Sequence, residues 1–293
     1  MTAVNLGKIG VWTSYRPFGV GLASEAAKLV EQLGYGTWWI GASPRVPDVR
    51  PVLEATSRLV AATGILNVWA NDPAETAAAT AAVRAKFPGR LMLGIGVGHR
   101  EATTEYRTPL ATMRAFLDGL DASATPPPPE ERCLAALGPK MLALARDVAD
   151  GAHPYNTTVA QTAEARAVLG PHKLLCVEQK VLLETNAARA REIARAYLRP
   201  YLRLPNYVNS WRRAGFDDSD FTDNGSNRLV DTLVAWGDED ALVARVREHW
   251  QAGADHVCIQ ALYADPGKST LDGPNIELIR HLAPLARESN TSP

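Results

Sequence analysis

Residues 65–96 read ILNVWANDPAETAAATAAVRAKFPGRLMLGIG: a short apolar run, an alanine-rich stretch and a second apolar run. Short apolar runs with β-branched and aromatic residues are typical of strands, and they predict strands at Ile65–Trp69 and Leu91–Gly96. Between them, Asn71-Asp72-Pro73 supplies a helix cap before strong helix formers, which predicts a helix over about Ala74–Lys86. This stretch is therefore predicted to be one strand–helix–strand unit.

The same unit recurs along the whole chain of 293 residues. The predicted strands are Lys8–Trp12, Thr37–Gly41, Ile65–Trp69, Leu91–Gly96, Cys133–Leu137, a short strand within Gly151–Tyr155, Leu174–Glu184 and His256–Leu262. The predicted helices that follow them are about Ala23–Leu33, Val49–Ala62, Ala74–Lys86, Leu110–Leu120, Lys140–Ala149, Val159–Leu169, Ala187–Leu198 and Asn275–Arg287. Strand–helix units in this number predict an α/β fold, a (β/α)8 TIM barrel that forms a single domain over residues 1–293. An open doubly wound sheet fits less well, because no G-x-G-x-x-G follows the first strand.

Two segments depart from the repeat. Asp121–Arg132 holds four consecutive prolines and is predicted to be a stiff, exposed connector without helix. An insertion at about 199–236 separates the seventh and eighth predicted strands, and we expect extra helices there, at the barrel mouth or at a dimer surface. Its aromatic residues Tyr207, Trp211 and Phe216 either line a substrate pocket or pack in an interface, and packing is the preferred interpretation.

Composition excludes several classes of partner. The formal charge is -1 and the pI about 6.6, without a basic block, so nucleic acid is not expected as a partner. No apolar run approaches the length of a membrane span and the N-terminus lacks a signal layout, so a cytoplasmic protein is expected. Cys133, Cys176 and Cys258 are predicted to be buried rather than paired in disulfides, and no metal site is predicted from the spacing of histidines and cysteines.

A barrel places its site at the carboxyl ends of the strands, which defines the candidate residues. The rim is rich in aromatic, amide and glycine residues and poor in carboxylates, which suits a flat, largely apolar redox cofactor. The candidates for cofactor binding are Trp12, Thr13, Asn67, Trp69, Asn71, Gly96, Gly98, His99, Gly138, Pro139, His153, Tyr155, Thr157 and Thr158.

Three of these features leave alternatives open. Gly94, Gly96 and Gly98 share one face of a strand, which indicates either a wall open to a ring or close packing of another backbone. Thr157-Thr158 could bind phosphate at a helix start or simply cap the helix. His99 is the candidate catalytic residue, as a proton donor or acceptor, or else a solvated loop residue. Glu178 is interpreted as structural and placed low in the barrel.

Taken together, these residues resemble the luciferase-like monooxygenase superfamily, in particular its actinobacterial branch of oxidoreductases that use coenzyme F420. The matching stretches are GVWT (10–13), EQLGYGTWWIG (31–41), GILNVW (64–69), LGIGVGH (93–99), LAALGPKM (134–141), ADGAHPY (149–155) and LLETNAARAR (182–191). They occur in order along the whole chain.

The resemblance implies a barrel that binds a deazaflavin or flavin at its mouth, usually as a homodimer. It also implies a non-prolyl cis peptide, expected near Trp69–Asn71, a cofactor phosphate near Tyr155–Thr158, and His99 facing the reactive carbon. The strand end Ile40–Pro44 lacks the histidine of the sugar-phosphate enzymes, so that activity is not expected.

The expected function is an F420-dependent oxidoreductase that transfers a hydride between the deazaflavin and a small organic substrate. An FMN-dependent luciferase-like monooxygenase and a non-catalytic (deaza)flavin-binding protein are the alternatives.

Overall fold

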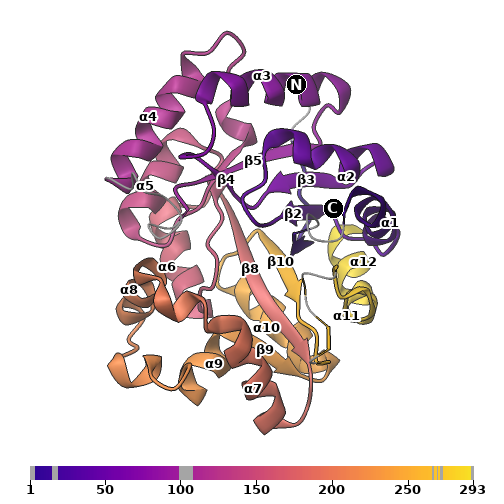
Figure 1. The fold of residues 1–293 in the computed structure, drawn as a ribbon, viewed down its shortest axis with the longest axis vertical. Coiled ribbons are helices and arrows are strands. Elements are labelled where there is room, and N and C mark those ends of the chain that lie inside the picture. The colour runs from indigo at the N-terminus through magenta and orange to yellow at the C-terminus, as the bar shows by residue number, and fades with distance from the viewer. Residues whose placement is uncertain are drawn as a thin grey trace.

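Parallel strands form a closed barrel in the computed structural model, which describes residues 4–14, 19–98, 108–265, 267–268, 270 and 273–291 (Figure 1). In this part of the chain, the ring consists of β1 (Ile9–Thr13), β2 (Thr37–Ile40), β3 (Val60–Thr63), β5 (Leu91–Gly96), β6 (Arg132–Leu134), β7 (Gly151–Ala152), β8 (Leu174–Leu183) and β10 (His256–Ala261). The ring closes because β10 pairs with β1 on one side and with β8 on the other. The predicted TIM barrel is confirmed.

Helices surround this barrel (Figure 1). They are α1 (Gly19–Gln32), α2 (Arg50–Ala55), α3 (Pro73–Lys86), α4 (Pro109–Asp121), α5 (Pro139–Val148), α6 (Val159–Leu169), α7 (Ala187–Leu198), α10 (Glu239–Gln251), α11 (Ile276–His281) and α12 (Ala283–Thr291). Asp72 caps α3 by accepting from the Glu75 amide, with Pro73 in the first turn, as the sequence predicts. The single predicted helix over Asn275–Arg287 is instead two, α11 and α12.

The strands alternate between two apolar layers. Outward side chains such as Ile9, Trp38 and Leu93 pack against the helices and form the large outer core. Inward side chains fill a smaller inner cluster, which contains Trp39, Met92, Cys133, Cys176 and Cys258. All three cysteines are buried and free, as predicted, and burial raises the pKa of the Cys258 thiol.

The third strand lies earlier in the chain than predicted. The predicted helix over Val49–Ala62 ends at Ala55, and β3 begins at Val60. Only the two-residue strand β4 (Leu66–Asn67) falls within the predicted strand Ile65–Trp69, and it pairs with β5. The non-prolyl cis peptide joins Gly64 to Ile65, so its expected position near Trp69–Asn71 was wrong.

The early end of α2 has a long-range cause. The Glu31 carboxylate accepts hydrogen bonds from the amides of residues 57, 58 and 59, and Arg90 donates to the carbonyls of Leu53, Thr56 and Leu59. These contacts provide hydrogen-bond partners for backbone amides and carbonyls that a longer helix would have paired internally. The helix can therefore end at Ala55, and the chain turns into β3.

The proline-rich connector is largely exposed, but it is anchored to the barrel. Its end forms a 3-10 turn, η3 (Pro129–Glu131), and the buried Arg132 donates to the Pro127 carbonyl and pairs with Asp121. The connector is therefore held to the barrel both by this ion pair and through the Pro127 carbonyl.

The insertion holds helices α8 (Pro205–Arg213) and α9 (Asn227–Leu233), which confirms the expected extra helices. It also contributes an unpredicted strand, β9 (Val234–Gly237). Lys180 pairs with Val234 of β9 and with Gln260 of β10, so β9 lies on the side of β8 opposite to β10. Helix α10 between β9 and β10 was also not predicted. No helix among the described residues is long and apolar enough to cross a membrane.

Candidate functional site

Trp12 and Tyr155 form an aromatic contact at the carboxyl ends of β1 and β7. Their ring centroids are 4.9 Å apart, and Tyr201 of the insertion extends the contact at 5.6 Å from Tyr155. A Cβ on Gly41 would lie 2.5 Å from the Trp12 ring, and one on Gly64 would lie 2.9 Å from Trp12 Nε1. These two glycines therefore provide the space in which the indole lies.

His153 lies buried inside the barrel, stacked on Trp39 with centroids 4.1 Å apart. Its Nδ1 is 2.8 Å from the Cys176 carbonyl oxygen, which can only accept, so Nδ1 carries the proton of the neutral ring. Burial lowers the pKa of His153 to about 4. Nε2 is therefore a hydrogen-bond acceptor at neutral pH.

Asn156, which follows β7, is held by hydrogen bonds on both sides. Its backbone is left-handed, with φ 55°, a conformation that asparagine tolerates. The Asn156 amide donates to Glu178 Oε2 at 3.1 Å, and Trp211 Nε1 donates to the Asn156 carbonyl at 2.9 Å. Lys180 Nζ donates to the side-chain Oδ1 at 2.5 Å.

Glu178 and Lys180 form an ion pair inside the barrel, with Lys180 Nζ 3.1 Å from Glu178 Oε1 and both side chains 1% exposed. Lys180 Nζ also lies 4.0 Å from the centroid of the Tyr155 ring, a cation–π contact. Burial lowers the pKa of Lys180, and the Glu178 carboxylate opposes this shift. Tyr155 in turn donates to Gln260 Oε1 and shares a hydrogen bond with the Tyr201 hydroxyl.

Several buried polar atoms around this barrel end have no partner within the described residues. These mouth atoms are Trp12 Nε1, Ser14 Oγ, His153 Nε2, Asn156 Nδ2 and Thr157 Oγ1. Buried polar groups in native proteins are nearly always hydrogen-bonded, so unpaired atoms at the ends of the same two strands, β1 and β7, indicate a site for a polar ligand or for ordered water. Their donors and acceptor suit the carbonyl and ring N–H groups of a flavin-type ring.

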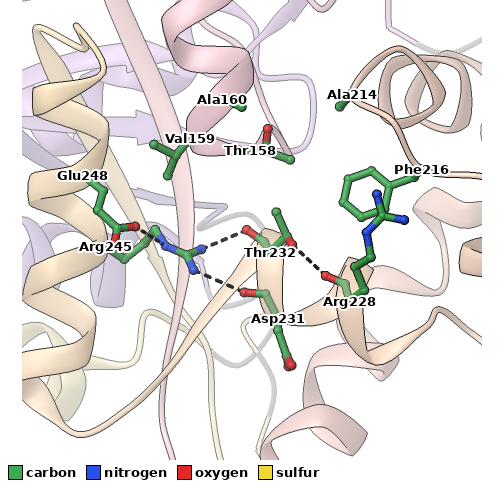
Figure 2. Close-up of a pocket in the computed structure, with 10 residues that line it drawn as sticks. All are labelled: Thr158, Val159, Ala160, Ala214, Phe216, Arg228, Asp231, Thr232, Arg245 and Glu248. Carbon is green, nitrogen blue, oxygen red and sulfur yellow. Dashed lines mark hydrogen bonds and ion pairs between the residues drawn. The ribbon is translucent and has the colours of Figure 1, made fainter.

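A cavity of about 510 Å³ lies on the outer side of the same segment, at the N-terminus of α6 (Figure 2). Thr158, Val159 and Ala160 line it together with Arg228 and Arg245 from α9 and α10. Arg245 is held by Glu248 and by the carbonyls of Asp231 and Thr232, as Figure 2 shows. The chain from Tyr155 to Ala160 therefore leads from the barrel mouth to a cavity with two guanidinium groups.

Thr158 is the N-cap of α6. Its side chain accepts from the Gln161 amide, and Gln161 returns a bond to the Thr158 amide, so the capping interpretation is confirmed for this residue. Thr157 is different, because its buried hydroxyl is one of the mouth atoms.

The predicted residues of the third strand end bind one another. Asn67 Oδ1 accepts from the Trp69 amide, Asn71 Nδ2 donates to the Asn67 carbonyl, and Trp69 Nε1 donates to the Val97 carbonyl. Their side-chain bonds thus fold the β4–α3 turn against β5. A role for them toward a ligand stays a prediction.

The glycine strand packs against its neighbour. A Cβ on Gly94 would lie 1.9 Å from the Thr63 carbonyl oxygen, one on Gly96 would lie 2.5 Å from Ile65, and one on Gly98 would lie 2.8 Å from Asn67. The structure thus favours close packing over an open wall, the two alternatives that the sequence leaves open.

The remaining predicted residues have different positions. Thr13 follows the inward Trp12, so strand alternation directs its side chain away from the interior. Gly138 is the N-cap of α5, and the Arg213 guanidinium beside it donates to the Leu137 carbonyl. Pro139 is exposed in the first turn of α5. His99 lies outside the described residues.

Sequence reasoning missed much of the polar network. The residues of this network that were not among the predicted site residues are Lys180, Tyr201, Gln260, Ser14 and Asn156. Glu178 is not low in the barrel. Since β7 has only two residues, which pair with Leu174 and Leu175, the loop after it meets β8 at the level of Glu178. The charged pair at i and i+2 on one strand face was the available signal.

The sequence profile of the luciferase-like monooxygenase family matches residues 4–256, so the chain belongs to this family. Members of this family are oxidoreductases, and the predicted enzyme class is confirmed at that level. Among the described residues, no group of three or more His, Cys, Asp or Glu side chains is arranged to hold a metal ion.

Solved structures with the same fold include both deazaflavin and flavin enzymes. An F420-dependent secondary alcohol dehydrogenase in complex with an F420–acetone adduct is 16% identical, with TM-score 0.69 over 95% of this chain and 99% of that one. The F420-dependent tetrahydromethanopterin reductase from Methanopyrus kandleri is 15% identical, with TM-score 0.70 over 96% and 98%. The oxygenating constituent of 3,6-diketocamphane monooxygenase from Pseudomonas putida, with FMN, is 13% identical, with TM-score 0.65 over 98% and 100%. Similarity at these identities shows the fold alone.

Proposed function

We propose that the protein is an F420-dependent oxidoreductase that transfers a hydride between the deazaflavin and a small organic substrate at the barrel mouth. The observation that carries the proposal is the group of mouth atoms, which are buried without partners among the described residues and belong to the ends of β1 and β7, where Trp12 and Tyr155 are in contact. A planar ring with polar edges would satisfy both features, since its faces stack and its edges form hydrogen bonds.

The residues present fit such a cofactor at both ends. Trp12 and Tyr155 would orient the ring and exclude water, and His153 Nε2 would accept a hydrogen bond from it. The cavity of Figure 2 at the α6 N-terminus would be the place for an anionic group, which would share Arg228 with Asp220 and Arg245 with Glu248. The cofactor supplies the hydride chemistry, and the protein supplies orientation and electrostatics.

Binding measurements test this proposal most directly. Purified protein is titrated with oxidised F420, reduced F420 and FMN, and binding is followed by cofactor fluorescence and calorimetry. Tight binding of F420 with weak binding of FMN supports the proposal. Binding of FMN alone would favour an FMN-dependent monooxygenase, for which the FMN-containing structural neighbour is the supporting observation.

His99 is the proposed proton donor or acceptor, on the grounds of its place in the sequence after the glycine strand. Replacing His99 with alanine should reduce turnover and leave cofactor affinity unchanged. Tight F420 binding without turnover in a substrate screen would instead support a non-catalytic deazaflavin-binding protein.

A homodimer and a small-molecule substrate are part of the same proposal. Sedimentation equilibrium at micromolar protein concentration would report twice the 31.6 kDa chain mass for a dimer.

A further inference from the structure

We propose that the side-chain Nδ2 of Asn156 donates a hydrogen bond to a carbonyl oxygen of the bound ring, and that the Glu178–Lys180 pair holds Asn156 in the position that this bond requires. The inference rests on the proposed function, because it assigns a role to one residue of that site.

The orientation of the Asn156 amide follows from its partner. A lysine ammonium can only donate, so the side-chain atom 2.5 Å from Lys180 Nζ must be the oxygen Oδ1. The other atom of the amide is then the NH₂ group, Nδ2. Asn156 is 2% exposed, and Nδ2 has no partner among the described residues.

Every other polar group of Asn156 is occupied. The backbone amide is bound to Glu178, the carbonyl to Trp211 and Oδ1 to Lys180. Within the described part of the chain, the residue therefore presents a single free donor group in a fixed place, with its backbone held in the left-handed region at φ 55°. A fixed donor costs little entropy when it binds an acceptor.

The amide lies on the barrel side of its loop. Lys180 Nζ, which holds Oδ1, is also 4.0 Å from the Tyr155 ring, and Tyr155 packs against Trp12. The cavity at the α6 N-terminus lies beyond Thr158, on the outer side of the same segment. Position thus assigns Nδ2 to the ring end of a ligand rather than to its phosphate end, and the acceptor is a ring carbonyl.

The Glu178–Lys180 pair acts through Asn156 and is a positioning pair. Glu178 Oε2 holds the backbone of Asn156 and Lys180 holds its side chain, so both contacts fix the same residue from one strand. An ion pair that is 1% exposed on both sides contributes little net stability by itself, which leaves orientation as its effect.

Variants of Asn156 test the donor. Asn156→Gly keeps the left-handed backbone and removes the amide, whereas Asn156→Asp keeps an oxygen for Lys180 and replaces only the donor. Asn224→Gly is the matched control, because Asn224 is exposed, lies in the insertion and also has a left-handed backbone, with φ 65°. Near-UV circular dichroism and thermal melting check that each variant is folded.

Dissociation constants for riboflavin, FMN and F420 are then measured by fluorescence. All three share the ring carbonyls, and riboflavin lacks phosphate. Asn156→Gly should weaken binding of all three by the same factor, about three- to tenfold, and Asn156→Asp should weaken it further because two acceptors then face each other. Asn224→Gly should match the wild type.

A loss with FMN and F420 but not with riboflavin would assign the amide to the phosphate and overturn the ring assignment. Unchanged constants in folded variants would overturn the inference while the proposed function stands, since the wild type still binds. Failure of the wild type to bind any of the three would overturn both.

Coupling tests the positioning role. The double variant Glu178→Gln, Lys180→Met should lose affinity as Asn156→Gly does, and adding Asn156→Gly to it should cause no further loss. Additive losses would show that the pair acts independently of Asn156. Should the double variant fail to fold, Trp211→Phe removes the contact to the Asn156 carbonyl instead, and its effect should likewise disappear in the Asn156→Gly background.

Discussion

His153 stacks on Trp39 inside the barrel, with ring centroids 4.1 Å apart and an interplanar angle of 15°. The contact places an imidazole in an apolar interior, where burial lowers its pKa to about 4. The ring is therefore neutral in the folded protein at any pH above that value, and its protonation is linked to unfolding.

This linkage predicts a loss of stability in mild acid. Because burial depresses the pKa of His153 in the folded state, the imidazole is neutral in both states above the unfolded value of 6.5, and the stability of the fold is complete there. As the pH falls from 6.5 toward about 4, the unfolded chain binds the proton first, and stability is lost. His153→Phe keeps the stacking and removes the titration, so its free energy of unfolding should fall by about 2–3 kcal/mol less than that of the wild type between pH 7 and 4.5. Urea unfolding at both pH values measures this, with the exposed His172→Gln as control. Parallel losses in His153→Phe and the wild type would contradict it.

The close packing of the glycine strand gives a second prediction. A Cβ on Gly94 would lie 1.9 Å from the Thr63 carbonyl oxygen, so Gly94→Ala should lower the free energy of unfolding by at least about 1–3 kcal/mol. In the matched variant Gly21→Ala, a Cβ on helix α1 meets nothing within 4 Å. That variant should be about 0.4–1 kcal/mol more stable, because alanine favours the helix. Equal melting temperatures for the two variants would argue against this packing.

Removing one charge of the Glu178–Lys180 pair should lower the free energy of unfolding more than removing both charges. Lys180→Met leaves the Glu178 carboxylate buried without its cation and should cost about 3–5 kcal/mol. The double variant Glu178→Gln, Lys180→Met removes both charges and should recover most of this loss. Chemical denaturation of Lys180→Met, of Glu178→Gln and of the double variant completes the cycle, and a double variant less stable than Lys180→Met would contradict the prediction.

Glu31 should stabilise the turn into β3 in a pH-dependent way. Burial raises its pKa, but hydrogen bonds from the amides of Arg58, Leu59 and Ser57 outweigh this, and the net pKa is below the usual 4.5. A depressed acid contributes stability above its unfolded pKa and loses it as the pH falls through the folded value. Glu31→Gln should therefore be about 1–2 kcal/mol less stable at pH 7, and the difference should shrink below pH 4. Thermal melts at pH 7 and pH 3.5 test this, and a constant difference would count against it.

The barrel could be predicted because its signals are local. Each apolar run and each cap, such as Asp72 before Pro73, lies within a few residues of the element it defines. The start of β3 depends instead on Glu31 and Arg90, which lie about thirty residues away on either side, and no local pattern contains them. Helix α10 was missed because its sequence EDALVARVREHWQ is mostly polar, and only Leu242, Val246 and His249 are buried.

The candidate site was predictable only for those residues that lie near the ends of predicted strands. Trp12 lies near the end of β1, and His153, Tyr155 and Thr157 lie in the loop after β7, and they were identified from those positions. Lys180 lies within a long apolar strand, and its contact with Asn156 depends on β7 being only two residues long. Strand length sets the height at which a loop meets its neighbour, and this is a property of the assembled sheet rather than of either segment.

Strand β9 gives the insertion an unusual attachment. The chain leaves the sheet at the end of β8 and returns to pair with the same strand, from Lys180↔Val234 to Leu183↔Gly237. Both ends of the insertion are therefore attached to the same strand, β8. A change in the length of the segment between α7 and α9 would therefore leave the register of the barrel unchanged, provided that the contacts of Tyr201 with Tyr155 and of Trp211 with Asn156 are kept.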